Sequence, residues 1–139
     1  MKILKSVYLK ILGSYPVPPP EQGGILGIKN GIVCEYYHDG SCNIADRAVY
    51  EPDVDTLNRK IEEWDAQGIS FGGIVHSHLS GQNTLSAEDK KYIELLLGTL
   101  NGQTLYFPIV IPSAEQVISY VAERKSGDII IRQDEIHTV

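Results

Sequence analysis

Apolar residues follow two different periods along this chain, and each period predicts a different kind of element. Three segments repeat apolar residues every three or four positions, the spacing that places them on one face of a helix. These segments run from Ile3 to Leu12, from Asp53 to Gln67 and from Ser86 to Leu97. Gly13 and the prolines that follow it end the first segment. The pattern therefore predicts three amphipathic helices.

Six shorter runs are rich in residues that favour strands. They run from Gly23 to Ile28, Ile32 to Tyr37, Ile69 to His76, Leu105 to Ile111, Gln116 to Ala122 and Asp128 to Arg132. Asn30-Gly31 between the first two is a strong hairpin signal, so those strands are expected to be antiparallel. A polar loop containing Gly40 to Asn43 is expected before the second helix. The pattern predicts an α/β fold, with a mixed, mostly antiparallel sheet flanked by helices.

Composition and charge narrow the classes of protein that this sequence fits. With 139 residues, of which 42% are hydrophobic and 22% charged, the chain can bury a core of its own. Residues 1–139 contain no internal repeat and no linker beyond a proline triplet, so a single domain is expected. Lysine and arginine total 12 against 18 aspartate and glutamate residues, without a basic cluster. Nucleic acid is therefore not an expected partner.

The sequence also predicts where the protein resides. No apolar run approaches the roughly 18 residues needed to span a bilayer, and the first residues mix lysine with apolar side chains. A secretory signal peptide has a continuous apolar stretch instead. We therefore expect a cytoplasmic protein without a membrane partner. Cys34 and Cys42 lack the paired spacing of a structural zinc site and are expected to be ordinary reduced residues.

Two histidines lie at the end of the run from Ile69 to His76, the third of the predicted strands. In His76-Ser77-His78, strand alternation places both imidazoles on one face, near enough to share a metal ion. If a helix begins at Ser86, Asp89 lies in its first turn and can direct its carboxylate toward the end of the strand. Three protein ligands leave one tetrahedral position for water, which is typical of a catalytic zinc site. The sequence therefore predicts a zinc-activated water at these residues.

Such a water requires a general base, and Glu21 is the candidate that we favour. Gly23 and Gly24 follow it, and they would let its strand pass close to the site. An acid after three prolines is also compatible with a solvated loop residue. Glu35 or Glu51 then remains as an alternative base.

The spacing His76-x-His78, seven residues, Ser86, two residues, Asp89 resembles the signature of the JAMM or MPN-plus (JAB) zinc metalloproteases. The segment from Glu21 to Gly27 is similar to the upstream segment of that family. The resemblance implies a JAB/MPN-like fold and a short, stand-alone member of prokaryotic type. It also implies that His76, His78 and Asp89 bind one Zn²⁺ per chain. Glu21 would move the proton from the water to the leaving amine, and Ser86 would stabilise the oxyanion.

The same resemblance implies a zinc-dependent hydrolase that cleaves isopeptide or peptide bonds. Its expected substrate is the tail of a ubiquitin-like or sulfur-carrier protein. The family usually has proline after the second histidine, where this chain has Leu79, so altered loop stiffness without loss of metal is expected. The alternative is a non-catalytic MPN-type interaction module. Such modules typically lack one or more metal ligands, whereas every ligand position is filled here.

Simpler explanations exist for each half of the motif. Ser86 and Asp89 are also typical of a helix N-cap, and histidines at the end of a strand are usually polar residues entering a loop. Only their conjunction favours a metal site. A cysteine protease is excluded because neither cysteine has a matching histidine and asparagine pattern. A zinc deaminase is a weak alternative, because it needs HxE followed by PCxxC and neither string occurs.

Three further features complete the expectations. His38 and His137 have no partner at ligand spacing, so both are expected to be surface residues without a role. The composition of Tyr106 to Ile111 favours a sheet edge that could add a strand from a substrate. The sequence does not predict the oligomeric state.

Overall fold

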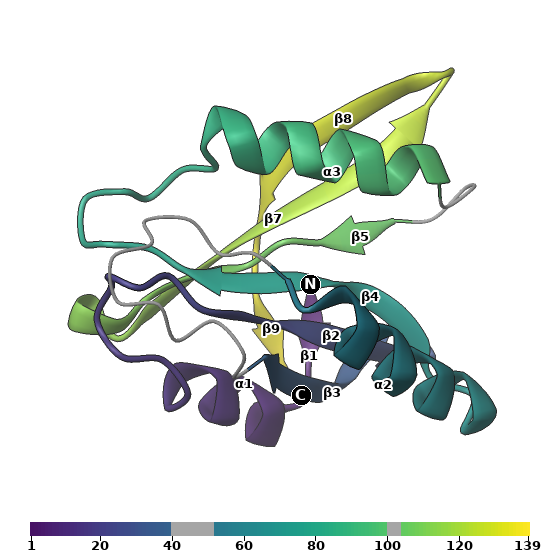
Figure 1. The fold of residues 1–139 in the computed structure, drawn as a ribbon, viewed down its shortest axis with the longest axis horizontal. Helices are drawn as coiled ribbons and strands as arrows, with labels where there is room; N and C mark the ends of the chain where they lie inside the picture. Colours follow the sequence, from purple (N-terminus) through teal and green to yellow (C-terminus); the bar gives the residue numbers. More distant parts are fainter. Residues whose placement is uncertain (40–51, 100–103) are drawn as a thin grey trace.

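The strands form one mixed sheet, and helices lie on both of its faces (Figure 1). The structure, a computed structural model, describes residues 1–39, 52–99 and 104–139. The strands are β1 (Lys2–Ile3), β2 (Gly23–Lys29), β3 (Ile32–Asp39), β4 (Ser70–Ser77), β5 (Leu105–Tyr106), β6 (Ile109–Ile111), β7 (Gln116–Lys125), β8 (Asp128–Asp134) and β9 (His137–Thr138). The helices are α1 (Lys5–Leu12), α2 (Val54–Ala66), α3 (Ala87–Thr99) and the short 3₁₀ helix η1 (Pro112–Ala114).

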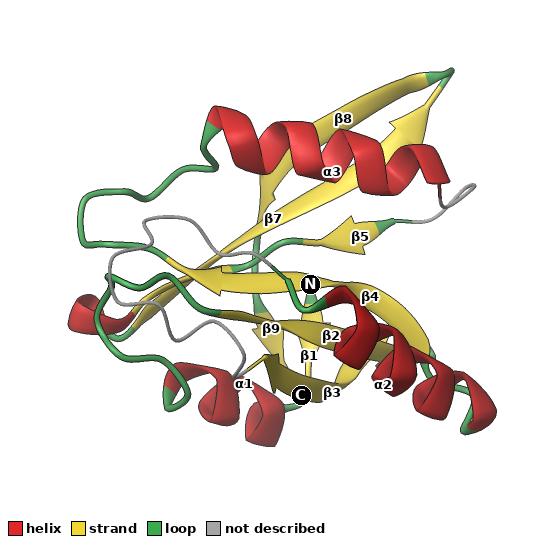
Figure 2. Cartoon of the chain, in the orientation of Figure 1, coloured by secondary structure: helices red, strands yellow, loops and turns green. Residues whose placement is uncertain are grey.

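The order of strands in the sheet is β5-β7-β6-β4-β2-β3-β1-β9, and β8 pairs with β7. The longest pairings are antiparallel, namely β2 with β3, β2 with β4 and β7 with β8. Shorter parallel pairings join β4 to β5 and β6, and β1 to β3 and β9. The predicted fold class, α/β with a mixed, mostly antiparallel sheet flanked by helices, is confirmed (Figure 2).

Alternate residues of the central strands pack into two separate hydrophobic clusters. Ile25 and Ile74 pack with residues of α2 and α3, whereas Leu26 and Val75 pack with residues of α1. Successive side chains of a strand point to opposite faces, so the two clusters lie on opposite sides of the sheet. His76 follows Ile74 by two residues and therefore faces the side that carries α2 and α3.

The predicted helices are confirmed, with shifts at their ends. The first was expected to begin at Ile3, but Ile3 belongs to β1, and the helix begins at Lys5. The two-residue strands β1 and β9 were not predicted. They pair with each other in parallel near the two ends of the described chain. Strands this short carry no periodic signal and depend on tertiary pairing.

The hairpin between β2 and β3 forms as expected. Asn30 and Gly31 have φ angles of 54° and 76°, the left-handed values that a two-residue turn of type I′ requires. The predicted polar loop from Gly40 to Asn43 lies outside the described residues. The same holds for Cys42 and Glu51.

The run from Leu105 to Ile111 is not one strand but two, and it is not a sheet edge. Pro108 has no N–H to continue the ladder, and β5 ends before it and β6 begins after it. Both short strands pair with β4 on one side and with β7 on the other. The hypothesis that this segment adds a substrate strand is therefore wrong.

Gly73 allows β5 to approach β4 closely. Its φ is 137°, and a Cβ added there would lie 1.8 Å from the carbonyl oxygen of Tyr106, which no side chain can tolerate. A register shift against β2 lies at the same place, between Leu26 and Gly27. This irregularity sets the course of β4 shortly before it reaches His76.

None of the helices in the described ranges is both long and apolar enough to cross a membrane.

Candidate metal centre

The end of β4 presents two buried imidazoles on the face that carries α3. The N–H of His76 donates to the carbonyl of Pro108 and that of His78 to the carbonyl of Val110, at 3.2 and 2.9 Å. The N–H of Ser77, between them, donates in the opposite direction to the carbonyl of Gln22. Alternating hydrogen bonds to β6 and toward β2 thus fix the backbone under both histidines. His76 and His78 are 6% and 4% exposed, so both residues are buried.

Asp89 reaches the histidines from the first turn of α3. The N–H of Ser86 donates to Oδ2 of Asp89 at 2.8 Å, and the N–H of Asp89 donates to Oγ of Ser86 at 3.0 Å. These reciprocal bonds satisfy backbone donors that the start of a helix leaves unpaired. The capping interpretation of the two residues is therefore right, and it also places the carboxylate beside the imidazoles.

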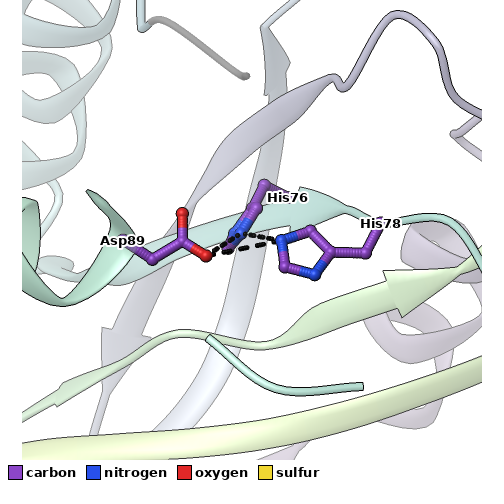
Figure 3. A group of neighbouring side chains, drawn as sticks. All are labelled: His76, His78 and Asp89. Carbon is purple, nitrogen blue, oxygen red and sulfur yellow. Dashed lines mark hydrogen bonds and ion pairs between the residues drawn. The ribbon is translucent and has the colours of Figure 1, made fainter. Parts of the chain in front are cut away.

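The three side chains converge with the spacing of zinc ligands (Figure 3). The Nε2 atoms of His76 and His78 lie 2.8 Å apart, and Oδ2 of Asp89 lies 3.2 and 3.4 Å from them. Tetrahedral zinc with bonds of roughly 2.0–2.1 Å has ligand atoms about 3.4 Å apart. The carboxylate distances match this value and the two nitrogens lie closer together, so two imidazoles and one carboxylate could hold a metal ion and leave one further coordination position.

The other nitrogen of His78 fixes the tautomer that a metal requires. Its Nδ1 lies 2.9 Å from the backbone carbonyl oxygen of Gln82, an acceptor, so Nδ1 carries the proton. In the neutral imidazole Nε2 then keeps the lone pair that a metal requires, whereas in the charged imidazole both nitrogens donate, Nε2 to Asp89. Metal-binding histidines commonly donate their second N–H to a carbonyl in this way. Sequence analysis missed Gln82 because a backbone carbonyl leaves no signal in the sequence.

Glu21 joins the site from the segment before β2. Its Oε1 lies 3.4 Å from Nε2 of His78, and its side chain is 13% exposed. Glu21 therefore lies beside His78, one of the two histidines. Glu35, an alternative base, is exposed on β3 opposite Gly27, away from the end of β2 where His76 pairs.

The two glycines after Glu21 have different roles in the packing around the candidate metal site. Gly23 pairs with His76 across the sheet. A Cβ on Gly24 would lie 2.4 Å from the carbonyl oxygen of Tyr37 and 2.8 Å from the ring of Tyr36, so Gly24 is needed for contact with β3. The explanation from Gly24 was wrong, although the position predicted for Glu21 holds.

Ser77 ties the Glu21 segment to the strand that carries the histidines. Its hydroxyl accepts a hydrogen bond from the N–H of Gln22 at 3.0 Å, and Ser77 is fully buried. The N–H of Ser77 donates to the carbonyl of Gln22 at 2.9 Å, and its hydroxyl donates to the same carbonyl at 3.4 Å, so three bonds join the residue after Glu21 to the residue between the ligands. Because successive side chains of a strand point to opposite faces, Ser77 faces away from the side to which His76 and His78 point. The position of this serine could have been expected from the sequence on that ground.

Hydrogen bonding shifts the pKa values of two site residues. Burial alone raises the pKa of Asp89, but hydrogen bonds from His76 and His78 outweigh it and hold that pKa well below its ordinary value. Burial lowers the pKa of His78, but its bonds to Asp89 and Gln82, with the charge of Glu21, raise it overall. Two carboxylates around the imidazoles make the site attractive to a cation.

The remaining histidines and the cysteine lie outside this group. His38 is half buried, with Nε2 3.1 Å from Oε1 of Gln22 and its ring against Tyr15, so it is not a free surface residue as expected. His137 is exposed, as expected, although it belongs to β9. Cys34 is a free, half-buried thiol in β3.

An apolar cavity of about 320 Å³ lies next to the site, between α2 and α3. Ile74 and Tyr92 are among its lining residues. Ile74 precedes His76 by two residues on the same strand face, which is about 6.6 Å along a strand. Tyr92 follows Asp89 by three residues, about one helical turn. Two of its lining residues are therefore near neighbours in sequence of His76 and Asp89, although none of the candidate ligands lines the cavity itself.

Comparison with known proteins shows that this fold is similar to that of a JAB1/MPN domain structure. No family model matches the sequence, and no protein of curated function matches it. Among solved structures, the chain is similar to protein DSY2949 from Desulfitobacterium hafniense, with a TM-score of 0.64 and 16% identity over 99% of this chain and 92% of that one. It is also similar to AF2198, a JAB1/MPN domain protein from Archaeoglobus fulgidus, with a TM-score of 0.56 and 24% identity over 100% and 99% of the two chains. These similarities establish a JAB1/MPN-like fold.

Proposed function

We propose that this protein is a zinc-dependent hydrolase of the JAMM type, which cleaves isopeptide or peptide bonds at the tail of a ubiquitin-like or sulfur-carrier protein. The observation that carries the proposal is the convergence of four side chains from three segments. His76, His78 and Asp89 offer ligand atoms at zinc spacing, and the Glu21 carboxylate lies 3.4 Å from one of the ligand nitrogens.

In this proposal His76, His78 and Asp89 hold one Zn²⁺ per chain. Zinc bound there supplies Lewis acidity and lowers the pKa of a coordinated water to about 7. Glu21 accepts a proton from the attacking water and passes it to the leaving amine as the C–N bond breaks. The hydroxyl of Ser86 accepts from the N–H of Asp89, so its own proton remains available to donate to the oxyanion of the carbonyl.

The apolar cavity supports a polypeptide tail as the substrate. Ile74 lines the cavity and precedes His76 by two residues, so the cavity lies on the face of the sheet that carries the candidate ligands. An apolar side chain near the scissile bond can then enter the cavity while the carbonyl lies at the zinc site. The exposed rim residues Val54 and Tyr92 add apolar surface around it.

The second candidate function is a non-catalytic MPN-type interaction module. It does not explain why a carboxylate outside the ligand set lies beside His78, since a module without catalysis needs no base. The two candidates differ in hydrolysis and not in fold.

The proposal is tested first by elemental analysis of purified wild-type protein and of Asp89→Ala. We expect about one zinc per wild-type chain and little in the variant, because a site with two imidazoles alone binds zinc weakly. Glu88→Ala is the matched control, since Glu88 is an exposed acid of the same helical turn. Absence of zinc from the wild-type chain after zinc is supplied would contradict the proposal.

Activity is then assayed on two fusions of a ubiquitin-like protein that ends in Gly-Gly. One joins its terminal carboxyl group to the ε-amine of a lysine peptide, and the other joins it to an α-amine. Release of either peptide by the zinc-loaded wild type supports a hydrolase, and the faster of the two identifies the bond. Zinc binding without release of either peptide would favour the interaction module.

A further inference from the structure

Strand β8 has an open edge. It pairs with β7 from Ser119–Asp134 to Lys125–Asp128, and no strand in the described ranges pairs with its other side. The hairpin of β7 and β8 extends beyond the neighbouring strand β5 in Figure 2. Exposed edges of this kind accept further strands unless charges, prolines or bulges protect them.

One hydrogen bond shows which residues of β8 direct their backbone groups outward. The carbonyl of Tyr120 accepts from the N–H of Phe107 at 2.7 Å, on the side of β7 away from β8. Tyr120 and its register partner Gln133 therefore form a pair without hydrogen bonds between them. By alternation, Ile129 and Ile131 also direct their N–H and C=O groups toward the open edge.

The side chains of this edge are apolar in the middle and oppositely charged at the two ends. Ile129, Ile130 and Ile131 are consecutive, and Ile130 is 40% exposed. Asp128 precedes them and Arg132 follows them, both exposed. Within the described residues Arg132 forms ion pairs with two acidic neighbours, Glu123 and Asp134, each at 3.9 Å.

We propose that β8 pairs with β8 of a second copy of this chain, antiparallel and with the two-fold axis at Ile130. In this register Asp128 of each copy lies opposite Arg132 of the other, which gives two opposite-charge pairs. Ile129 lies opposite Ile131 of the second copy, and these are the residues whose backbone groups point outward. The strand is therefore self-complementary in both charge and hydrogen bonding, as a two-fold interface requires.

Charge selects this register over its neighbour. A shift that moves the axis to Ile131 keeps the hydrogen-bonding pattern but places Asp128 opposite Asp134 of the second copy. Arg132 then lies opposite Ile130, so no opposite charges meet. Like charges directly opposite one another destabilise an antiparallel pair, whereas opposite charges stabilise it.

The proposal is tested by sedimentation velocity of the full chain over a wide range of concentration. A standard protein–protein interface buries about 1,600 Å² of surface, and the pairing of one strand buries less. The dimer is therefore expected to form reversibly as the concentration rises. Arg132→Asp alone and Asp128→Arg alone should each weaken the dimer by about tenfold or more. The double variant with both changes should restore it, because the two pairs form again with reversed charge.

Arg59→Asp, an identical charge change on the exposed side of α2, is the control and should leave the dimer unchanged. A wild-type chain that stays monomeric at every concentration would overturn the proposal. So would a dimer that ignores both single reversals, or a folded double variant that remains monomeric.

Hydrogen exchange of the wild type keeps the test decisive if a variant fails to fold. The amides of Ile129 and Ile131 should become protected as concentration rises, while that of Ile130 should not change. Equal exchange of Ile129 and Ile131 at low and high concentration would rule out pairing at this edge.

Discussion

The hydroxyl of Ser77 accepts a hydrogen bond from the backbone N–H of Gln22 across 3.0 Å, in the buried interior behind the candidate ligands. The bond joins the residue between the two histidines to the residue that follows Glu21. The distance between the candidate base and the candidate ligands therefore depends on a serine that touches neither a metal nor a substrate.

Ser77→Ala should destabilise the fold by about 1–3 kcal/mol, because it leaves the buried N–H of Gln22 without its acceptor. Ser119 offers a matched control in β7. It is also buried, and within the described residues its hydroxyl has no hydrogen-bond partner. Ser119→Ala should therefore change stability little. Urea unfolding of both variants measures the difference, and equal losses in the two would contradict the role of the Ser77 hydroxyl.

Glu21→Gln should abolish hydrolysis while zinc is retained. The amide keeps the shape of the side chain but cannot accept the proton of the attacking water. Because Glu21 is not one of the three proposed ligands, zinc content should stay near that of the wild type, whereas His78→Ala should lower both zinc and activity. Elemental analysis and the cleavage assay are run on the same samples. Equal loss of zinc in the two variants would refute the assignment of Glu21 as base.

Ser86→Ala separates a cap from an oxyanion donor. Loss of the cap costs about 1 kcal/mol of stability. Loss of one oxyanion donor lowers kcat by about 10²- to 10³-fold. We expect both effects, since the hydroxyl accepts from Asp89 and still has a proton to donate. A variant with a lowered melting temperature and an unchanged kcat would leave Ser86 as a cap alone.

Ile61→Trp should fill the cavity between α2 and α3, which Ile61 lines. If an apolar side chain of the tail enters there, the variant should raise KM for the fusion substrate at least several-fold without loss of zinc. Leu95→Trp serves as control, because Leu95 is 68% exposed on α3 and does not line the cavity. An unchanged KM in folded Ile61→Trp would show that the tail takes another path.

The sequence predicts the elements whose signals are local. Helix periodicity locates α2 and α3 within a few residues, and Asn30-Gly31 locates the first hairpin, because each depends on residues that are neighbours in the chain. The candidate ligands are also local, since a strand end and the first turn of the next helix hold all three. Their convergence could thus be expected before any coordinates.

Features that depend on distant pairing were not predictable in this way. The strand β1 exists because Ile3 pairs with Val33 and Thr138, and nothing in the first residues specifies those partners. Tyr106 to Ile111 has the composition of an edge strand but lies inside the sheet, because β7 returns to cover it. His38 is half buried by Tyr15 and Gln22, which precede it in other segments.

One oxygen atom of Asp89 serves two purposes. Oδ2 accepts a hydrogen bond from the N–H of Ser86 at the start of α3. The same atom lies within 3.4 Å of Nε2 of His76 and of Nε2 of His78. The position of the carboxylate is therefore set when the helix forms, before any ion arrives, so little conformational freedom remains to be lost on binding. A substitution at this position cannot alter affinity for a cation without also altering how the helix starts, which makes protein folding and ion affinity inseparable here.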